Sequence, residues 1–262
     1  MHTCPPTVPR TLLGNTGIEV SRHAIGTGTH GWSGNSDQTR RESGWLSGVL
    51  VRGYELGINY WDLADQYGSH GEARRALASL QRNELVLCTK TTSSGYGACR
   101  DDIQRFLREL STDYLDIVLL HCLTADTWPQ QYTGAMQALS EAKAAGWVRA
   151  AGISSHGIGA LTVAAEHPWV DALLVRLNYS GDNMDGSPRD IVRLTHRALA
   201  AGKGVTAMKV LGCGSLAHDP RRAISWVFDT GQVHAVTIGP TEDEQMEQCA
   251  SWVAAAHTAP PL

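Results

Sequence analysis

The sequence predicts a closed (β/α)8 barrel of the TIM type with a β-hairpin ahead of its first strand. Short apolar runs alternate with helix-like segments eight times along the 262 residues, which is typical of a parallel sheet covered on both faces. No linker or block of like charge interrupts this alternation. Residues 1–262 are therefore expected to form one domain, with about nine residues at the start and about six at the end flexible.

The first predicted element is a hairpin over residues 10–20. Two apolar pieces flank the turn sequence Gly14-Asn15-Thr16-Gly17, and turns of this kind join antiparallel strands. A hairpin that precedes a barrel in the chain can plug the N-terminal mouth of that barrel.

The eight barrel strands are expected at the apolar runs, and a helix is expected after each of them. Pro188 and Pro220 mark the start of two helices, and Gly57, Gly146 and Gly202 mark the end of three, one of which is the helix that Pro188 starts. The predicted strands cover residues 23–29, 59–63, 85–90, 115–121, 148–153, 172–178, 205–210 and 235–238. The predicted helices cover residues 40–56, 71–80, 98–110, 133–145, 158–166, 189–201, 221–228 and 242–256.

Charge and cysteine usage narrow the class of protein. The net charge is −4 and no dense basic run occurs, so nothing favours a nucleic-acid or membrane partner. The six cysteines form no C-x-x-C pair, and the eleven histidines form no H-x-H or H-E-x-x-H pattern. Reduced thiols and no metal site are therefore expected. Without an apolar signal segment at the N-terminus, the chain is expected to be cytoplasmic.

Four polar residues at strand ends predict one proton-handling site. Asp62 lies at the end of the second strand and Tyr67 just after it, while Lys90 and His121 end the third and fourth. Side chains at the carboxyl ends of parallel barrel strands converge, and barrel active sites are built there. A lysine at the end of a buried strand is costly unless it is paired. A phenol, an ammonium, a carboxylate and an imidazole held together predict a tuned general acid.

With these residues in place, the chain resembles the aldo-keto reductase family from about Arg10 to Cys249. The ordered set of motifs is specific, although each alone is weak. Asp62 and Tyr67 match the strand-two signature, and Lys90 and His121 fall where the family has its catalytic lysine and histidine. The remaining matches are the segments 10–29, 152–155, 207–214, 237–239 and 244–247.

The resemblance implies reversible hydride transfer between a nicotinamide dinucleotide and an aldehyde or ketone. Tyr67 would protonate the carbonyl oxygen as it becomes an alkoxide, with its pKa lowered by Lys90. Asp62 would hold Lys90, and His121 would orient the carbonyl. A non-catalytic dinucleotide-binding sensor and a dinucleotide-using isomerase or dehydratase remain alternatives. The partner would be a small carbonyl compound, and the protein either a monomer or a homo-oligomer.

The resemblance also assigns residues to the cofactor. Ser154 and Ser155 would meet the nicotinamide carboxamide, and Met208 would pack on the nicotinamide ring. Arg176 stands where the family has a glutamine, so it binds the carboxamide oxygen, reaches a substrate carboxylate, or forms an ion pair inside the barrel. The loop after strand seven would cradle the pyrophosphate. The full cofactor set is Gly28, Thr29, Asp62, Ser154, Ser155, Arg176, Met208, Lys209, Leu211, Cys213, Gly214, Gly239, Gln245 and Cys249.

NADPH is the cofactor that the family implies, and NADH is also possible. Residues 239–249 would hold the adenosine, but they contain no lysine or arginine to read a 2′-phosphate. The acidic run Glu242-Asp243-Glu244 would repel that phosphate.

Three loop residues are expected to line the substrate pocket. Trp32 and Trp128 would supply an apolar wall, unless they pack within the loops themselves. His30 lines the mouth or is an ordinary loop residue. The six residues from 257 to 262 are too few for the C-terminal segment that closes over the substrate in many relatives. An open site is expected unless the loop 30–39 or 123–132 covers it.

Overall fold

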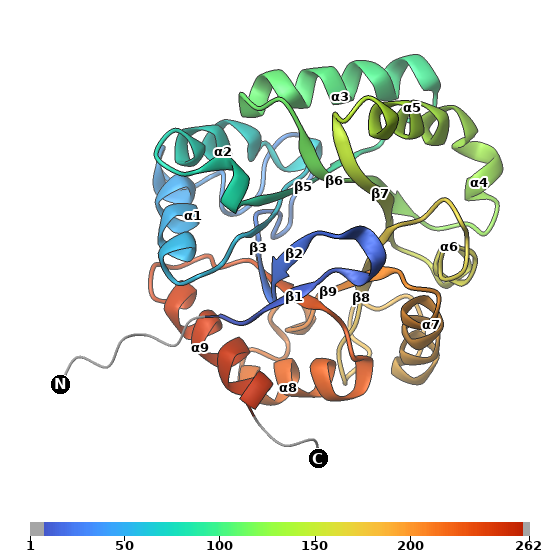
Figure 1. The fold of residues 1–262 in the computed structure, drawn as a ribbon. Coiled ribbons are helices and arrows are strands. Elements are labelled where there is room, and N and C mark those ends of the chain that lie inside the picture. The colour runs from blue at the N-terminus through green and yellow to red at the C-terminus, as the bar shows by residue number, and fades with distance from the viewer. Residues whose placement is uncertain (1–7, 259–262) are drawn as a thin grey trace.

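A closed barrel of eight parallel strands forms the centre of the protein (Figure 1). The structure is a computed structural model that describes residues 8–258. Around the barrel the strands follow the order β10-β3-β4-β5-β6-β7-β8-β9. They are β3 His23–Gly26, β4 Tyr60–Asp62, β5 Val86–Thr91, β6 Leu115–Leu123, β7 Val148–Ser155, β8 Ala172–Arg176, β9 Gly204–Met208 and β10 Ala235–Ile238. The predicted fold class is confirmed, and all eight predicted strands are present.

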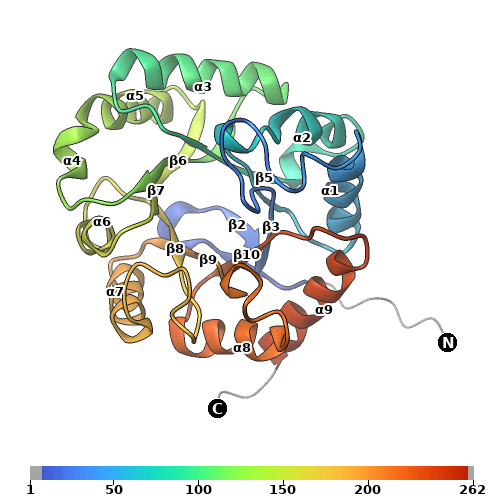
Figure 2. The ribbon, with the colours of Figure 1, turned by 180° about the vertical axis from the view of Figure 1, so that it is seen from behind.

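Helices form an outer ring around these strands (Figure 2). Each of the eight predicted helices is found in the described part of the chain, with small shifts at the ends, and the short helix α4 is additional. Their bounds are α1 Trp45–Glu55, α2 His70–Leu77, α3 Tyr96–Leu110, α4 Trp128–Gln131, α5 Thr133–Ala144, α6 Ile158–Ala164, α7 Pro188–Ala200, α8 Pro220–Gly231 and α9 Gln245–Thr258.

The largest helix error lies before α1. A helix from residue 40 was predicted, but α1 starts at Trp45 because Gly44 ahead of it takes a left-handed conformation with φ +94°. That backbone geometry suits glycine and interrupts a helix. Residues 27–44 therefore form a long connection on the side of the barrel where the parallel strands end (Figure 2).

Two apolar layers hold the fold together. One layer lies between the barrel and the helices, with side chains such as Ile25, Leu87 and Val118. The other fills the barrel itself and includes Tyr60, Ile117 and Met208. The strand residues alternate between these layers because successive side chains of a strand point to opposite faces. Burial on both faces explains why the strands read as continuous apolar runs.

The predicted hairpin consists of β1 Arg10–Leu12 and β2 Glu19–Ser21, which pair antiparallel. It crosses the end of the barrel that faces the viewer in Figure 1. Leu13 and Ile18 are fully buried within the apolar cluster that fills the barrel. A Cβ added at Gly204 would lie 2.5 Å from Leu13, so the plug sits directly on strand β9. The hairpin thus closes the N-terminal mouth, as predicted.

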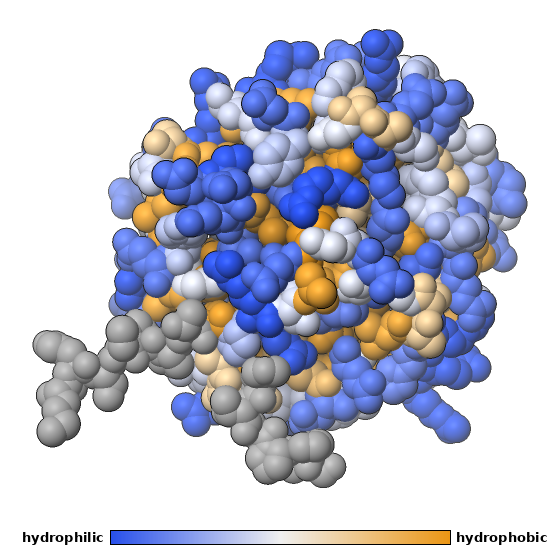
Figure 3. Space-filling view, viewed as in Figure 1, coloured by the Kyte–Doolittle hydropathy of each residue, from blue (hydrophilic) through white to orange (hydrophobic). Residues whose placement is uncertain are grey.

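The surface on the hairpin side contains both hydrophilic and hydrophobic residues. Hydrophobic residues show mainly between projecting hydrophilic ones (Figure 3). No helix among residues 8–258 is long and apolar enough to cross a membrane.

Most residues of the two chain ends, and one of the six cysteines, lie outside the described part of the chain. The ends expected to be flexible lie largely outside the described residues, but Val8 is buried and its N–H donates to Leu56 O at 3.3 Å. Five cysteines are free, namely Cys88, Cys99, Cys122, Cys213 and Cys249. Cys4 lies outside the described residues.

Candidate active site

The four predicted catalytic side chains meet at the C-terminal end of the barrel. Lys90 Nζ donates to Asp62 Oδ1 at 2.5 Å and to Leu63 O at 2.7 Å. The Tyr67 hydroxyl and His121 Nε2 are 3.3 Å apart. Lys90 Nζ lies 4.7 Å from the centroid of the Tyr67 ring. A phenol, an ammonium, a carboxylate and an imidazole therefore share one site.

Strand geometry explains this meeting. Asp62 is the last residue of β4, and Lys90 and His121 lie near the ends of β5 and β6, the next two strands around the barrel. Tyr67 ends the short 3-10 helix η2, Asp65–Tyr67, that follows β4. Consecutive parallel strands deliver their terminal side chains to one rim.

Lys90 is completely buried and stays charged through its partner. Burial on its own would lower the pKa of Lys90. The nearby Asp62 carboxylate, with Tyr67 and Cys88, outweighs burial and raises that pKa above its ordinary value. The site therefore holds a permanent positive charge next to the phenol.

The Tyr67 phenol corrects one prediction. Lys90 lowers the pKa of Tyr67, as expected, but burial of the phenol has the larger effect and Asp62 adds to it. The pKa of Tyr67 is consequently raised to about 12 instead of lowered. At neutral pH Tyr67 is fully protonated, as a proton donor must be.

His121 is neutral in this site. Its side chain is buried, and burial together with the Lys90 charge lowers the pKa of His121 to about 2. Nearby, burial and the Arg176 charge lower the pKa of His156 to about 3. A neutral ring has one N–H and one acceptor nitrogen. Nδ1 of His121 has no hydrogen-bond partner among the described residues.

Two glycines make room for Tyr67. A Cβ at Gly28 would lie 2.4 Å from the Tyr67 ring, and a Cβ at Gly31 would lie 2.7 Å from it. Both distances are too short for any side chain, so the connection 27–44 wraps closely around the phenol. Gly28 was assigned to the cofactor from sequence, and the structure places it against Tyr67.

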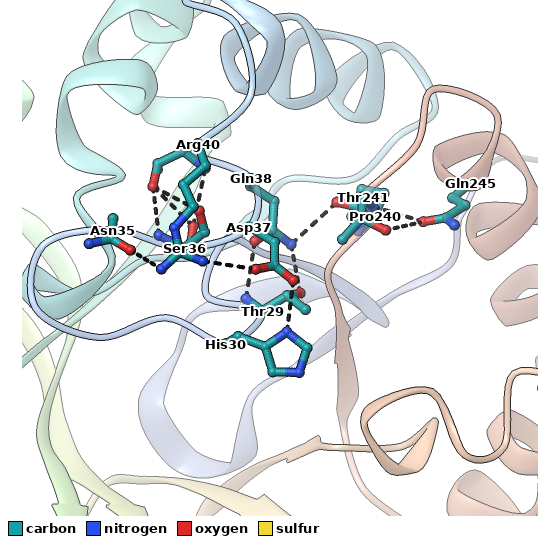
Figure 4. A network of polar contacts seen from close by, with 11 residues as sticks. Thr29, His30, Asn35, Ser36, Asp37, Gln38, Arg40, Pro240, Thr241 and Gln245 are labelled. Carbon is teal, nitrogen blue, oxygen red and sulfur yellow. Dashed lines mark hydrogen bonds and ion pairs between the residues drawn. The ribbon is translucent and has the colours of Figure 1, made fainter.

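The connection 27–44 is fastened to the end of β10 through Gln38 (Figure 4). Gln38 Oε1 accepts from the Thr29 N–H at 3.1 Å, and its Nε2 donates to Thr29 Oγ1 at 2.7 Å and to Pro240 O at 3.3 Å. A Cβ at Gly239 would lie 2.7 Å from the same Nε2. Thr29 and Gly239 thus adjoin. Gln38 was not predicted, because its partner at residue 240 is remote in the sequence.

Residues at and just before the start of α9 already have polar partners, some of them local and some in the segment 41–45. Gln245 Oε1 accepts from the N–H of Thr241 at 2.8 Å (Figure 4) and from that of Glu242 at 3.3 Å. Glu242 also pairs with Arg41 at 3.1 Å. Asp243 accepts from the indole N–H of Trp45 at 2.5 Å. Gln245, the first residue of α9, therefore reaches back to N–H groups ahead of the helix, as the glutamine of a capping box does.

The residues assigned to the carboxamide lie together at the ends of β7 and β8. Ser154 Oγ accepts from Cys122 N–H at 3.0 Å, and Ser155 Oγ donates to Gly157 O at 3.1 Å. Arg176 pairs with Asp185 at 3.2 Å. The predicted alternative of an ion pair at Arg176 is therefore present.

Each residue of this ion pair has one buried polar atom that makes no hydrogen bond to a described residue. Arg176 Nε and Asp185 Oδ2 are buried without a hydrogen-bond partner in the described part of the chain. Burial raises the pKa of Asp185 to about 6, although Arg176 opposes the rise. Asp185 was not predicted, because its loop carries no motif. The sequence held only an indirect signal, because the ion pair considered for Arg176 requires a carboxylate partner.

The loop after β9 is a tight turn with several residues in the left-handed conformation, and its Gly212 and Gly214 N–H groups donate within the loop, to Lys209 O at 2.8 Å and to Leu211 O at 2.9 Å. Lys209 and Cys213 both take φ +57°, and Gly214 takes φ +103°. Lys209 forms no ion pair with any described residue. Ser215 Oγ donates to Asp182 at 2.7 Å, which joins this loop to the one after β8. Leu211 directly precedes the 3-10 helix of this loop, Gly212–Gly214.

Two predicted residues turn out to be packing residues. Trp128 is 1% exposed, with its ring 5.2 Å from that of His167 and 6.1 Å from that of Trp169. It is therefore buried by the short helix α4 and does not line the mouth. Cys249 is buried in α9 within the outer apolar layer, where burial raises its pKa to about 12.

The other two pocket candidates lie at the mouth. Trp32 is 51% exposed, and its ring centroid is 6.0 Å from that of His121. His30 pairs with Asp37 at 2.7 Å (Figure 4). Within the loop 30–39, Trp32 thus presents an aromatic side chain beside His121. No cluster of three or more metal-ligating side chains occurs in residues 8–258.

Comparisons with known proteins agree with this architecture. The model of the Aldo/keto reductase family matches residues 24–226. An aldo-keto reductase of Mycobacterium ulcerans is 31% identical over 158 residues, which cover 57% of this chain and 50% of that protein. An aldo-keto reductase of Alternaria alternata is 23% identical over 89% of this chain and 73% of its own length. The chain spans about half the length of the Mycobacterium protein.

Solved structures share the fold. A putative aldo-keto reductase of Pseudomonas aeruginosa superposes with a TM-score of 0.79 at 23% identity, over 95% of this chain and 96% of that one. An aldo-keto reductase of Bacillus halodurans in its holo form gives 0.75 at 19% identity, over 97% and 92%. At these identities the likeness concerns the fold alone.

Proposed function

The chain belongs to the aldo/keto reductase family, and from that premise we propose that it transfers hydride reversibly between a nicotinamide dinucleotide and a small aldehyde or ketone. The observation that carries the proposal is the convergence of Lys90, Asp62, Tyr67 and His121 at the C-terminal rim. This rim is where barrel enzymes place their chemistry.

Tyr67 is proposed as the general acid. An alkoxide is a much stronger base than a phenolate, so a phenol with a pKa of about 12 still gives up its proton to the forming alkoxide. The phenolate left behind is stabilised by the Lys90 ammonium at 4.7 Å from the ring. General acid catalysis of this kind typically contributes about 10²–10⁴-fold.

Asp62 and His121 are proposed as positioning and orienting groups. Asp62 keeps Lys90 charged and fixed, because it accepts from Nζ and from Thr237 Oγ1. The neutral His121 ring, close to the Tyr67 hydroxyl, would donate a hydrogen bond to the carbonyl oxygen. The carbonyl oxygen of the substrate would then lie between two hydrogen-bond donors, the Tyr67 hydroxyl and the His121 ring N–H.

The residues present fit a nicotinamide dinucleotide, which when bound supplies the hydride. The carboxamide of that group has both an N–H donor and an oxygen acceptor. Arg176 Nε and Asp185 Oδ2 are a buried donor and a buried acceptor that lack partners in the described chain. We propose that these two atoms, with Ser154 and Ser155, form the carboxamide site.

The rest of the cofactor site is proposed along the rim. The loop from Lys209 to Gly214 would hold the pyrophosphate through the Lys209 cation, which has no ion pair within residues 8–258, and through those backbone N–H groups that do not donate within the loop. Residues 239–245 would hold the adenosine. Because residues 239–249 lack lysine and arginine and contain Glu242, Asp243 and Glu244, NADH is proposed to bind at least as well as NADPH.

The loop 30–39 suggests the kind of carbonyl compound. Trp32 offers a half-exposed aromatic face beside His121. We therefore propose carbonyl substrates with an apolar or aromatic substituent.

The test is a spectrophotometric assay with both reduced dinucleotides and a panel of aldehydes and ketones. Wild-type protein should oxidise the dinucleotide in the presence of a substrate. Tyr67→Phe should lose turnover but keep dinucleotide affinity, measured by fluorescence titration. A wild-type protein that binds a dinucleotide and reduces no carbonyl would refute the reductase and favour a sensor.

A further inference from the structure

An ion-pair cluster lies on the outer side of β5, behind the proposed catalytic residues. We infer that Arg105 of helix α3 is a positioning residue that fixes Tyr67 relative to Lys90. This inference rests on the proposed function. Arg105, Asp102 and Glu109 lie outside the motifs by which the sequence resembles its family, whereas Asp65 lies within the strand-two signature, between Asp62 and Tyr67.

Arg105 grips the turn that carries Tyr67. Its Nη1 lies 2.7 Å from Asp65 Oδ1, and its Nη2 lies 3.0 Å from Asp65 Oδ2. Two parallel bonds of this kind fix both distance and orientation. Asp65 and Tyr67 are the first and last residues of the single turn η2, Asp65–Tyr67. A displacement of Asp65 is therefore passed directly to the phenol.

The same cluster also forms a hydrogen bond to the strand that carries Lys90. Asp102 accepts from Arg105 at 2.8 Å and, through its other oxygen, from Thr91 Oγ1 at 2.5 Å. Glu109 accepts from Arg105 at 3.0 Å. Thr91 follows Lys90 directly on β5 and points to the opposite face of the strand.

A second connection reaches the residue before Lys90. Glu109 Oε2 lies 2.7 Å from His70 Nδ1, and His70 Nε2 lies 2.8 Å from Thr89 Oγ1. Both neighbours of Lys90 on β5 are thus tied to the cluster that holds Asp65. The Arg105 guanidinium therefore connects the turn that carries Tyr67, the proposed acid, with the strand that carries Lys90.

The charge balance makes the guanidinium essential to this arrangement. Arg105 faces three carboxylates, those of Asp65, Asp102 and Glu109. Without it these carboxylates would repel one another, and Asp65 would move away. An isolated surface ion pair has little effect, but a bidentate pair within a network is the exception.

The test compares Arg105→Gln, Arg105→Lys and the control Arg108→Gln. Arg108 is exposed on the same helix and forms no ion pair with a described residue. A misplacement of about 1 Å can cost about 10²-fold in rate, so Arg105→Gln should lower kcat about 10- to 100-fold. Dinucleotide affinity should change less than twofold. Arg105→Lys should recover part of the loss, and Arg108→Gln should behave as wild type.

A double variant separates positioning from stability. If Arg105 acts through Asp65, Arg105→Gln combined with Asp65→Asn should have the kcat of Arg105→Gln alone. Losses that multiply would overturn the inference. So would an unchanged kcat in folded Arg105→Gln, or an equal loss of kcat and dinucleotide affinity. If Arg105→Gln does not fold, Asp65→Asn alone must lower kcat about 10-fold or more, with dinucleotide affinity retained. An inactive wild type would instead refute the proposed function itself.

Discussion

Replacing Lys90 by methionine tests the central electrostatic interaction. The ammonium lies 4.7 Å from the centroid of the Tyr67 ring. At that separation, and with an effective dielectric constant of about 20, it stabilises the phenolate by about 3.5 kcal/mol. This corresponds to about two to three pKa units. In Lys90→Met the pKa of Tyr67 should rise further above its present value of about 12.

The expected consequence is a large loss of rate in both directions. Alcohol oxidation requires the phenolate, whose population at a fixed pH falls tenfold per pKa unit, so kcat for oxidation at pH 9 should fall about 10²–10³-fold. Steady-state rates with saturating dinucleotide measure this. Lys143→Met, which removes a lysine that pairs with Asp171 away from the rim, is the control and should keep its activity.

Stability has to be separated from chemistry in this variant. Lys90→Met leaves Asp62 buried without its cation, which should cost about 3–5 kcal/mol of unfolding free energy. Asp62→Asn added to Lys90→Met removes that unpaired charge. Urea unfolding should show recovered stability in the double variant, while oxidation stays slow. A Lys90→Met protein that is folded and oxidises alcohol at the wild-type rate would refute the reasoning.

Three further predictions concern other parts of the molecule. Gly28→Ala should lower kcat about tenfold or more, because its Cβ would lie 2.4 Å from the Tyr67 ring; unchanged kinetics would contradict that contact. Glu242→Gln should improve NADPH affinity relative to NADH about 3- to 10-fold, read from dinucleotide titrations; an unchanged ratio would count against the adenosine assignment. Burial holds some histidines neutral in the folded state, below the pKa of about 6.5 that they have in the unfolded chain. On acidification the unfolded state therefore binds protons first, and the free energy of unfolding should fall below pH 6.5 by about 1.4 kcal/mol per pH unit for each such histidine. Urea midpoints at pH 7 and pH 5.5 measure this effect of His23, His121 and His156, whose folded pKa values are about 4, 2 and 3, and a flat profile would refute it.

The barrel and the four central residues were predictable because both follow from local patterns. Apolar runs of strand length, separated by helix signals, indicate parallel units whatever their distant neighbours are. Once the strands are placed, Lys90 and His121 must share a rim. The order of the strands around the barrel then follows their order in the sequence.

Other features depend on contacts that sequence patterns do not reveal. Gln38 matters through Pro240, about 200 positions away. Trp128 reads as a loop residue, yet the short helix α4 buries it. The pKa of Tyr67 moves opposite to the expectation, because the charges near it could be read from the chain but the depth of its burial could not. Arg105 looks like an ordinary solvated helix position.

The hairpin at the N-terminal end of the barrel affects the route by which reactants reach Tyr67. Leu13 and Ile18 close that opening with buried apolar side chains. Reactants and products of the proposed reaction would therefore enter and leave at the opposite end of the barrel, where Tyr67 lies. Protons exchanged with Tyr67 would use the same side.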